Sequence, residues 1–465
     1  MKMRILLMIA LMISLAQNAI AAEYYMSPFG NDSNPGTLAA PWRTLDRLQR
    51  AQSSLRPGDT VWFLGGNYVI NDSAAFLYYR WNTDGTASAH IKYRNYQNQV
   101  PVIVFDRRVY NNPQSWGYIF GLGDYIEVDG LTFLQTEPSR ALGMVNGVTV
   151  NKDMTPTVFS SYGTGVEIRN CTIENFSGLG IFYHGRNILV ENNRIIGTGS
   201  HGFYVAGYGG TFRYNELDGS RGYSNQYEIQ LQYETCIGNL IYGNLIKNGR
   251  AANVVLSGSV ANNQIFNNVF INNVPKLNGD YSNGLGYFCW KNYDGTPARV
   301  LSGNKFYNNT MIGKYYYVID TKIGLPSGSN CGATNGGRPL ADKTEIYNNI
   351  FYPIALPDGS LESLPLMKNN IFFNIRGSLP AGNTLVNPNL VNPSGSTSAD
   401  AMLQAGSPAI DQATSGAPAL DYRSGARPVG AAADVGAFEY GAPPGSGGGP
   451  VGGGGSPSDP NFPCI

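Results

Sequence analysis

The chain has 465 residues, of which 58 are glycine and 30 are tyrosine, and only 14% are charged. Abundant glycine with few charges is typical of a turn-rich all-β protein. The 32 basic residues equal the 32 acidic ones in number, which argues against nucleic acid as the main partner.

The first 21 residues have the pattern of a secretory signal peptide. Lys2 and Arg4 form a basic start, an apolar stretch follows at residues 5–15, and Ala19-Ile20-Ala21 fits a small-x-small cleavage site. No later apolar stretch is long enough to span a membrane. We therefore expect residues 1–21 to be removed, and the mature protein to be a monomer that is secreted or held at the cell surface.

Residues 23–70 are expected to form a cap. A short strand at residues 23–26 precedes an amphipathic helix for which Thr44 is the expected N-cap, and Pro57-Gly58-Asp59 then turns the chain into a strand at residues 60–64. A solenoid needs such a segment because its first coil would otherwise expose its core. The residues expected on one face of the helix are Leu45, Leu48, Ala51 and Leu55.

A repeated phrase follows, in which apolar residues stand two apart around a polar pair, as in residues 188–195 (ILVENNRI) and 346–351 (IYNNIF). The second residue of the pair serves as a mark, and successive marks are 40, 22, 22, 29, 24, 41, 40 and 21 residues apart. A basic step of about 22 residues predicts a solenoid of short parallel strands, with one coil per step. The marks are Leu131, Cys171, Asn193, Asn215, Asn244, Asn268, Asn309, Asn349 and Asn370.

Three columns of residues keep a fixed distance from the marks. The residues three before and two after each mark are all apolar, so we expect both columns to point inward and to stack between coils. The residues two before are charged or mostly aromatic and are expected to face outward. Seven of the nine marks are asparagine, which tolerates a left-handed turn and can bond to the asparagine of the next coil. We interpret them as a structural asparagine ladder at a corner, with Cys171 as a buried thiol within it.

Both ends of the repeat region resemble a known family. The opening YYMSPFGNDSNPGT with PGDTVWFLGGNY, and the ending GSPAIDQA, DYRSGARP and DVGAFEY, are similar to segments of secreted bacterial right-handed parallel β-helix proteins. These belong to the pectate-lyase-like superfamily, which includes polysaccharide lyases. The resemblance implies a right-handed parallel β-helix domain over residues 22–440, with a cap at 23–70 and a closing segment at 400–440. Residues 441–465 are rich in glycine and proline and are expected to form a flexible, disordered tail.

A second repeat predicts the functional face. The phrases GLGIFYHG, GSHGFYVAG and GLGYFCWK align on Gly180, Gly202 and Gly286. This alignment places Phe182, Tyr204 and Phe288 in one outward column and His184, Ala206 and Trp290 in the next. The strand EIQLQYE, which lies between them in the stack, would present four residues outward: Glu228, Gln230, Gln232 and Glu234. We expect the loop at residues 274–299 to overhang this face.

Such a face suits sugar rings, and β-elimination from a uronate would need three groups on it. These are a base for the C5 proton, a partner for the carboxylate and an acid for the leaving oxygen. We expect imidazole or lysine as the base, Tyr204 as the proton donor and Arg213 or Arg221 as the carboxylate partner. The candidate catalytic residues are His184, His201, Tyr204, Arg213, Arg221 and Lys291. The candidate substrate-binding residues are Phe182, Glu228, Gln230, Gln232, Phe288 and Trp290.

Structural alternatives stand beside these roles. His201 lies at a turn, where it could cap a coil, and Arg213 shares a column with Glu191, which permits a plain salt bridge between coils. The outward aromatic residues could be covered by the long loops.

No cofactor is predicted from the sequence. The coils lack the dense aspartate cluster of many calcium-dependent relatives, although calcium stays open, and no Cys and His spacing suggests zinc. The leading expectation is a lyase that cleaves an acidic polysaccharide. The alternatives are a non-catalytic surface or adhesion protein that binds glycans, and a glycoside hydrolase or epimerase. A hydrolase is disfavoured because Glu228 and Glu234 would stand roughly 20 Å apart along one strand.

Overall fold

The structure is a computed structural model that describes residues 21–71, 74–76, 78–106, 118–136, 157–176, 178–221, 227–274, 282–288, 302–323, 344–353, 366–375, 378–414 and 416–445. The expected signal peptide, apart from Ala21, and the expected tail beyond residue 445 lie outside this part of the chain. In the described part, no helix is long and apolar enough to cross a membrane.

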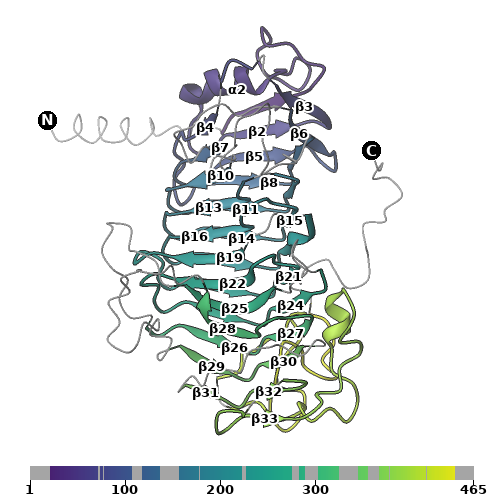
Figure 1. Cartoon of the computed structure of the whole chain (residues 1–465). Helices are drawn as coiled ribbons and strands as arrows, with labels where there is room; N and C mark the ends of the chain where they lie inside the picture. The colour runs from purple at the N-terminus through teal and green to yellow at the C-terminus, as the bar shows by residue number, and fades with distance from the viewer. Residues whose placement is uncertain are drawn as a thin grey trace, which may run out of the picture.

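The protein is a right-handed parallel β-helix, as predicted. Figure 1 shows the coils stacked along one axis, with the N-terminal cap at one end and the C-terminal residues folded back beside the last coils. The chain visits three long parallel sheets in turn, which we call sheets 1, 2 and 3. All of the paired strands within them run parallel, and a complete coil adds one strand to each of the three sheets.

Sheet 1 has twelve strands. They are β1 (Glu23–Met26), β2 (Thr60–Phe63), β5 (Ile91–Asn95), β8 (Ile126–Asp129), β11 (Glu167–Arg169), β14 (Leu189–Glu191), β17 (Thr211–Arg213), β20 (Leu240–Tyr242), β23 (Gln264–Phe266), β26 (Lys305–Tyr307), β29 (Glu345–Tyr347) and β31 (Met367–Lys368).

Sheet 2 also has twelve strands. They are β3 (Gly66–Ile70), β6 (Pro101–Phe105), β9 (Thr132–Gln135), β12 (Thr172–Glu174), β15 (Arg194–Ile196), β18 (Glu216–Asp218), β21 (Leu245–Lys247), β24 (Val269–Asn272), β27 (Thr310–Gly313), β30 (Ile350–Pro353), β32 (Ile371–Phe372) and β33 (Thr384–Leu385).

Sheet 3 has nine strands and carries the predicted functional face. They are β4 (Tyr79–Trp81), β7 (Tyr118–Leu122), β10 (Thr157–Ser161), β13 (Ile181–Tyr183), β16 (Phe203–Val205), β19 (Tyr227–Gln232), β22 (Ala252–Ser257), β25 (Asn283–Phe288) and β28 (Ile319–Ile323).

The cap is built as the sequence predicts. Helix α2 (Leu45–Ala51) begins after Thr44, whose hydroxyl accepts a hydrogen bond from the Arg47 N–H at 3.1 Å. A 3₁₀ turn, η1 (Gln52–Ser54), follows it. The four apolar side chains predicted for one face of the cap helix are buried against the first coil, and they close the N-terminal end of the core. These side chains are Leu45, Leu48, Ala51 and Leu55.

The inward columns predicted from the marks form the core. Val190 pairs in register with Phe212, and Ile195 with Leu217, and all four are almost completely buried. Because each apolar side chain sits on the equivalent one of the next coil, the core is a continuous stack along the axis.

The asparagine ladder is also confirmed, at the corner between sheets 1 and 2. The Asn244 side chain donates to Asn268 Oδ1 at 2.9 Å, and the contact repeats along the ladder. Cys171 takes the place of one asparagine in the ladder, and its thiol is buried. Its backbone N–H donates a hydrogen bond to Asn193 Oδ1 at 2.9 Å. A shorter ladder, which we did not predict, joins Asn239, Asn263 and Asn304.

The left-handed turn at this corner falls one residue before the mark, and not on the mark itself. Asn192, Asn267 and Asn308 have φ of 56°, 51° and 49°. The two asparagines of each pair therefore have different roles. The first adopts the left-handed conformation, and the second forms side-chain hydrogen bonds to the neighbouring coils.

In the last coils the first asparagines of the pairs bind the closing segment. Asn369 donates to Gln412 O at 2.8 Å, Asn348 to Thr414 O at 3.3 Å and Asn267 to Leu420 O at 2.6 Å. Residues 412–414 and 416–420 thus run back along the corner, from the last coils toward the middle of the stack. We call residues 390–440 the C-terminal segment; it includes a 3₁₀ turn, η5 (Ser398–Ala401).

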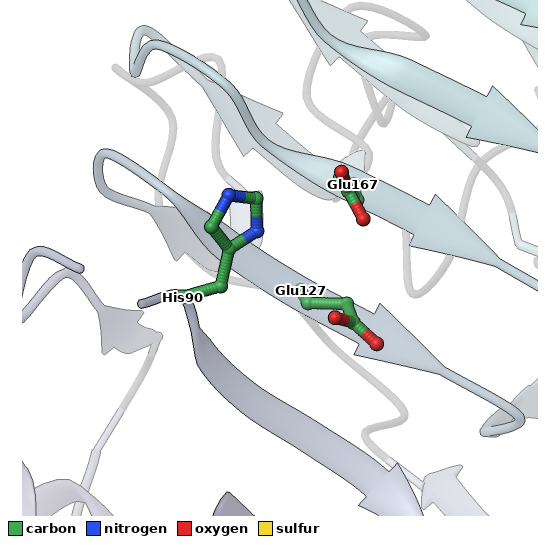
Figure 2. Close-up of side chains that lie close together, drawn as sticks. All are labelled: His90, Glu127 and Glu167. Carbon is green, nitrogen blue, oxygen red and sulfur yellow. The ribbon is translucent and has the colours of Figure 1, made fainter. Parts of the chain in front are cut away.

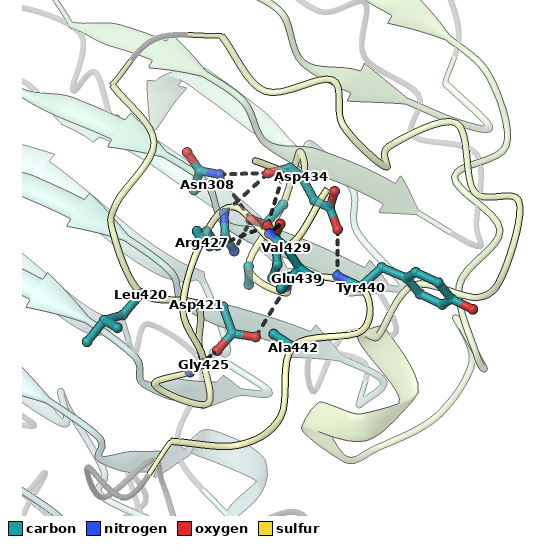
Figure 3. A network of polar contacts seen from close by, with 12 residues as sticks. Asn308, Leu420, Asp421, Gly425, Arg427, Val429, Asp434, Glu439, Tyr440 and Ala442 are labelled. Atoms are coloured by element: carbon teal, nitrogen blue, oxygen red, sulfur yellow. Dashed lines mark hydrogen bonds and ion pairs between the residues drawn. The ribbon is translucent and has the colours of Figure 1, made fainter. Parts of the chain in front are cut away.

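The C-terminal segment closes a second apolar core on the outer face of sheet 2. Val269, Ile312 and Ile350 of the sheet pack there against residues such as Tyr422 and Phe438. A buried polar network holds the segment together, as Figure 3 shows. At its centre the guanidinium of Arg427 donates to Gly436 O at 2.9 Å and to Asp434 O at 3.2 Å, and its Nε lies 3.7 Å from Glu439 Oε2.

Candidate functional site

An aromatic row covers the outer side of sheet 3 over β10, β13 and β16. Register places Phe182 beside Tyr204, with ring centroids 5.2 Å apart. Tyr162 lies 5.8 Å from Phe182 and 5.3 Å from the His184 ring, and Tyr233 lies 6.2 Å from Tyr204. We call these five residues the aromatic face. Tyr162 is 61% exposed, so the face is open to solvent at this residue.

His184 supplies the imidazole of this face. It follows β13 directly, and its Nε2 lies 3.2 Å from the Thr235 hydroxyl, which itself donates to Ala206 O at 2.6 Å. Partial burial lowers the pKa of His184, and the nearby Glu234 carboxylate opposes that shift. The ring is therefore neutral near pH 7 and can accept a proton.

Tyr204 lies at the centre of the aromatic face and is only 6% exposed. Burial, together with the neighbouring Tyr233 hydroxyl, raises the pKa of the Tyr204 phenol well above its usual value. The phenol therefore stays protonated and can donate a proton or a hydrogen bond.

Gln230 and Gln232 are in the predicted place on β19, where Gln230 pairs with Tyr204. Both are nearly buried, and the Gln230 amide donates to the Gln232 side-chain oxygen. Their amides are thus partly engaged with each other.

Glu228 does not face outward with them as predicted. It is 1% exposed and lies at the corner between sheets 2 and 3, under the 3₁₀ turn η3 (Gly219–Arg221). Burial and the Asp218 carboxylate raise the pKa of Glu228 well above normal, against an opposing effect of Arg250. Among the described residues its Oε1 has no hydrogen-bond partner, and the chain comes so close at Gly219 that a Cβ there would clash with that oxygen.

His201 lies at the same corner and is held by the backbone. Its Nδ1 is 3.2 Å from both the N–H and the carbonyl oxygen of Tyr227, and its ring stacks on the Tyr227 ring at 5.2 Å. Burial lowers the pKa of His201 to about 4. This geometry is that of the coil-capping alternative considered from the sequence.

Arg213 lies on sheet 1, not on sheet 3. It makes the inter-coil salt bridge with Glu191 that was the alternative to a catalytic role, at 2.6 Å, and it also donates to the Tyr242 hydroxyl at 3.1 Å. The structure therefore does not bring Arg213 together with the aromatic face.

The prediction that Phe288 shares a column with Phe182 and Tyr204 is wrong by two residues. In the register of sheet 3, Phe203 pairs with Ile229, Ile229 with Val254, and Val254 with Leu285. The third phrase should therefore align on Gly284 instead of Gly286. Gly286 takes the place of Phe288 in the column. A shift of two keeps every side chain on its face, which is why Tyr287 is buried as predicted.

Several predicted residues lie outside the described part of the chain. These are Trp290 and Lys291, most of the overhanging loop at 274–299, and the side chains of Arg221 and Phe288. Conversely, the sequence reasoning missed Tyr162, Tyr233 and Thr235. Tyr162 follows β10, whose sequence lacks the glycine-aromatic phrase. Tyr233 and Thr235 follow β19, for which the sequence predicted only the outward glutamates and glutamines.

Within the described residues, one group of His, Cys, Asp or Glu side chains is compact enough to share a metal ion. It consists of His90, Glu127 and Glu167, which lie close together at sheet 1 (Figure 2). The aromatic face belongs to sheet 3. Two carboxylates supply few of the six to eight oxygen ligands that calcium takes, so the group does not suit calcium.

Comparison with known proteins agrees with the observed fold. Residues 24–226 match the family described as "Pel9A-like, right handed beta helix region". No curated protein matches the sequence at a significant level.

Two solved structures resemble the chain over nearly its whole length. One is pectate lyase Pel9A, with 16% identity, a TM-score of 0.54, and coverage of 90% of this chain and 97% of that one. The other is the complex of XylC with xylose, with 13% identity, a TM-score of 0.52, and coverage of 90% and 98%. At these identities the likeness concerns the fold. The chain is thus a right-handed parallel β-helix protein, and its residues 24–226 match a Pel9A-like right-handed β-helix region.

Proposed function

We propose that the protein is an exported lyase that binds an acidic polysaccharide along the aromatic face of sheet 3 and cleaves it by β-elimination. The observation that carries the proposal is the position of a neutral imidazole, His184, and a protonated phenol, Tyr204, on either side of Phe182. The signal-like residues 1–21 and the fold shared with a pectate lyase support it.

The two groups have the protonation states that the reaction needs. His184 takes the proton from C5 of the uronate, and the electron pair of that bond forms the C4–C5 double bond. The bond from C4 to the leaving oxygen breaks, and Tyr204 protonates that oxygen. The aromatic rings, whose centroids lie 5.8 Å and 5.2 Å apart, offer flat apolar surfaces against which the sugar rings of the polysaccharide would pack.

Arg186 is the best candidate for the carboxylate partner among the described residues. It lies two residues beyond His184, its side chain is exposed, and its guanidinium is 5.6 Å from the centre of the Tyr208 ring. A bidentate guanidinium stabilises the charge that develops on the uronate as C5 loses its proton.

A non-catalytic glycan-binding protein is the second candidate. It is favoured by the engagement of other polar groups, since His201 is bonded to backbone, Arg213 to Glu191, and Gln230 to Gln232. A face rich in aromatic rings serves binding as well as catalysis.

One experiment separates the candidates. The protein is incubated with pectate, alginate and glycosaminoglycans, while absorbance reports unsaturated uronates and a parallel assay reports binding. We expect absorbance to rise on at least one substrate and to be lost in His184→Ala with binding retained. Binding without any cleavage would establish the glycan-binding alternative, and new reducing ends without unsaturated uronate would indicate a hydrolase.

A further inference from the structure

Three side chains on the outer face of sheet 1 converge although they are far apart in sequence. His90 stands immediately before β5, Glu127 lies on β8 and Glu167 on β11, so they belong to three successive coils. Glu127 and Glu167 are direct neighbours in register. One nitrogen or oxygen atom from each residue lies within 4.8 Å of the others, and Figure 2 shows the imidazole turned toward the two carboxylates.

Each carboxylate is held by one arginine and keeps one oxygen free. Arg94 Nε donates to Glu127 Oε1 at 2.6 Å, and Arg169 lies 2.5 Å from Glu167 Oε2. In the described part of the chain, the second oxygen of each carboxylate makes no hydrogen bond. Outer partners of this kind fix the orientation of metal-binding carboxylates.

The set also has the composition and the size of a transition-metal site. One imidazole with two carboxylates suits zinc and similar divalent ions, whereas calcium takes only oxygen ligands and more of them. Two ligand atoms of a tetrahedral ion with bonds of roughly 2.0–2.2 Å lie roughly 3.3–3.6 Å apart. Atoms within 4.8 Å of one another therefore come into range by an approach of roughly 1 Å, which rotation of the three side chains can supply.

We propose that His90, Glu127 and Glu167 bind a divalent transition-metal ion that joins three successive coils near the N-terminal end of the solenoid. The ion links the residue directly before β5 to β8 and β11. Metal that binds the folded chain preferentially stabilises it, so the site acts on the stability of these coils. It is independent of the aromatic face on sheet 3.

Zinc titration of the tag-free full chain tests the proposal, with calorimetry for binding and thermal unfolding for stability. We expect one zinc ion per chain and a higher unfolding midpoint with zinc than with EDTA. His90→Phe keeps a ring beside Tyr125 but removes the nitrogen ligand, and Glu167→Gln keeps the shape but removes the charge. Each variant should weaken zinc binding at least tenfold, while calcium should give no comparable rise in the midpoint.

His184→Phe is the matched control, because the chain has only three histidines and His201 is buried. This variant should bind zinc as the parent protein does. The proposal is overturned if zinc does not bind, if His90→Phe binds it equally well, or if His184→Phe alone loses it. Binding that depends on His90 but leaves the unfolding midpoint unchanged would overturn the cross-linking role.

Discussion

The Oδ1 atom of Asn268 accepts two hydrogen bonds from Asn244, one from the side-chain Nδ2 at 2.9 Å and one from the backbone N–H at 3.0 Å. The same paired contact joins Asn215 to Asn244 in the coil before. Each ladder asparagine thus satisfies buried backbone groups of its neighbours as well as its own amide.

Replacing an interior ladder residue should therefore destabilise the solenoid strongly. Asn244→Ala removes the side chain that the Asn215 N–H donates to and that donates to the Phe212 carbonyl, and it takes away one of the contacts of the Asn215 amide. At about 1–3 kcal/mol for a buried polar group left unpaired, we expect a loss of about 3 kcal/mol or more in denaturant unfolding. Asn67→Ala on the exposed side of β3 is the control and should change little; equal effects of the two would contradict this role.

Arg427 should anchor the C-terminal segment. Arg427→Met removes its bonds to Asp434 O and Gly436 O and leaves the buried Glu439 carboxylate without its cation. Breaking a buried pair in this way costs about 3–5 kcal/mol, so limited proteolysis should cut residues 390–440 much faster than in the parent. The exposed Arg56→Met serves as control, and unchanged cleavage of the Arg427 variant would refute the prediction.

His201 should make the fold sensitive to mild acid. Its folded pKa of about 4 lies below the ordinary 6.5, so the unfolded chain binds a proton first and stability is lost as pH falls from about 6.5 toward 4. The full effect is about 3 kcal/mol. His201→Phe keeps the stack on Tyr227 and should flatten the pH dependence of the unfolding midpoint in this window, whereas an unchanged slope would speak against a neutral buried imidazole.

Glu228 should have the opposite pH dependence. Its folded pKa is raised, so its contribution to stability is complete below the ordinary carboxyl pKa and is lost as pH rises toward the folded value. Glu228→Gln removes this titration. The change in midpoint between about pH 5 and about pH 8 should therefore be smaller in the variant, and the variant should be the more stable protein at the higher pH. A steeper dependence in Glu228→Gln would show that the carboxylate is buried in its charged form.

Tyr162 should contribute directly to polysaccharide binding, because it is the most exposed ring of the aromatic face. An aromatic contact is worth about 0.5–1.5 kcal/mol, so Tyr162→Ala should weaken binding roughly two- to tenfold without changing the fold. Phe29→Ala is the matched control, since Phe29 is 91% exposed but lies in the cap. Equal losses of affinity in the two variants would place the binding surface elsewhere.

The fold could be predicted from the sequence because every coil of a parallel β-helix repeats the same pattern of inward and outward residues at nearly the same spacing. The Asn193 and Asn215 marks, 22 residues apart, predicted both the inward columns and the ladder. The position of the left-handed residue was not predictable in the same way. Both members of an Asn-Asn pair tolerate that conformation, and only the structure shows that the first one adopts it.

The candidate site was only partly predictable, for two physical reasons. Glycine served to align the phrases, but Glu228 and Asn253 occupy the equivalent positions between Gly202 and Gly284, so the alignment slipped by two residues. Contacts between side chains on different coils could not be predicted from the sequence either. His90, Glu127 and Glu167 are 37 and 40 residues apart, and inserts of unequal length removed any fixed spacing by which to connect them.

The docking of the C-terminal segment on the corner asparagines limits how the number of coils can change. Gln412, Thr414 and Leu420 meet Asn369, Asn348 and Asn267, so the spacing of these carbonyls measures the distance between particular coils. The Tyr214 hydroxyl also meets this segment, 3.2 Å from Ser424 Oγ. A coil inserted before Tyr214 would lengthen the solenoid and leave the spacing of all these contacts intact. A coil inserted between Asn267 and Asn369 would keep the ladder and the core continuous. It would, however, move these asparagines apart, so that the C-terminal segment could no longer reach all of them at once. The N-terminal half is therefore the part of this protein in which repeats can be gained or lost singly, whereas the C-terminal half can change only together with its closing segment.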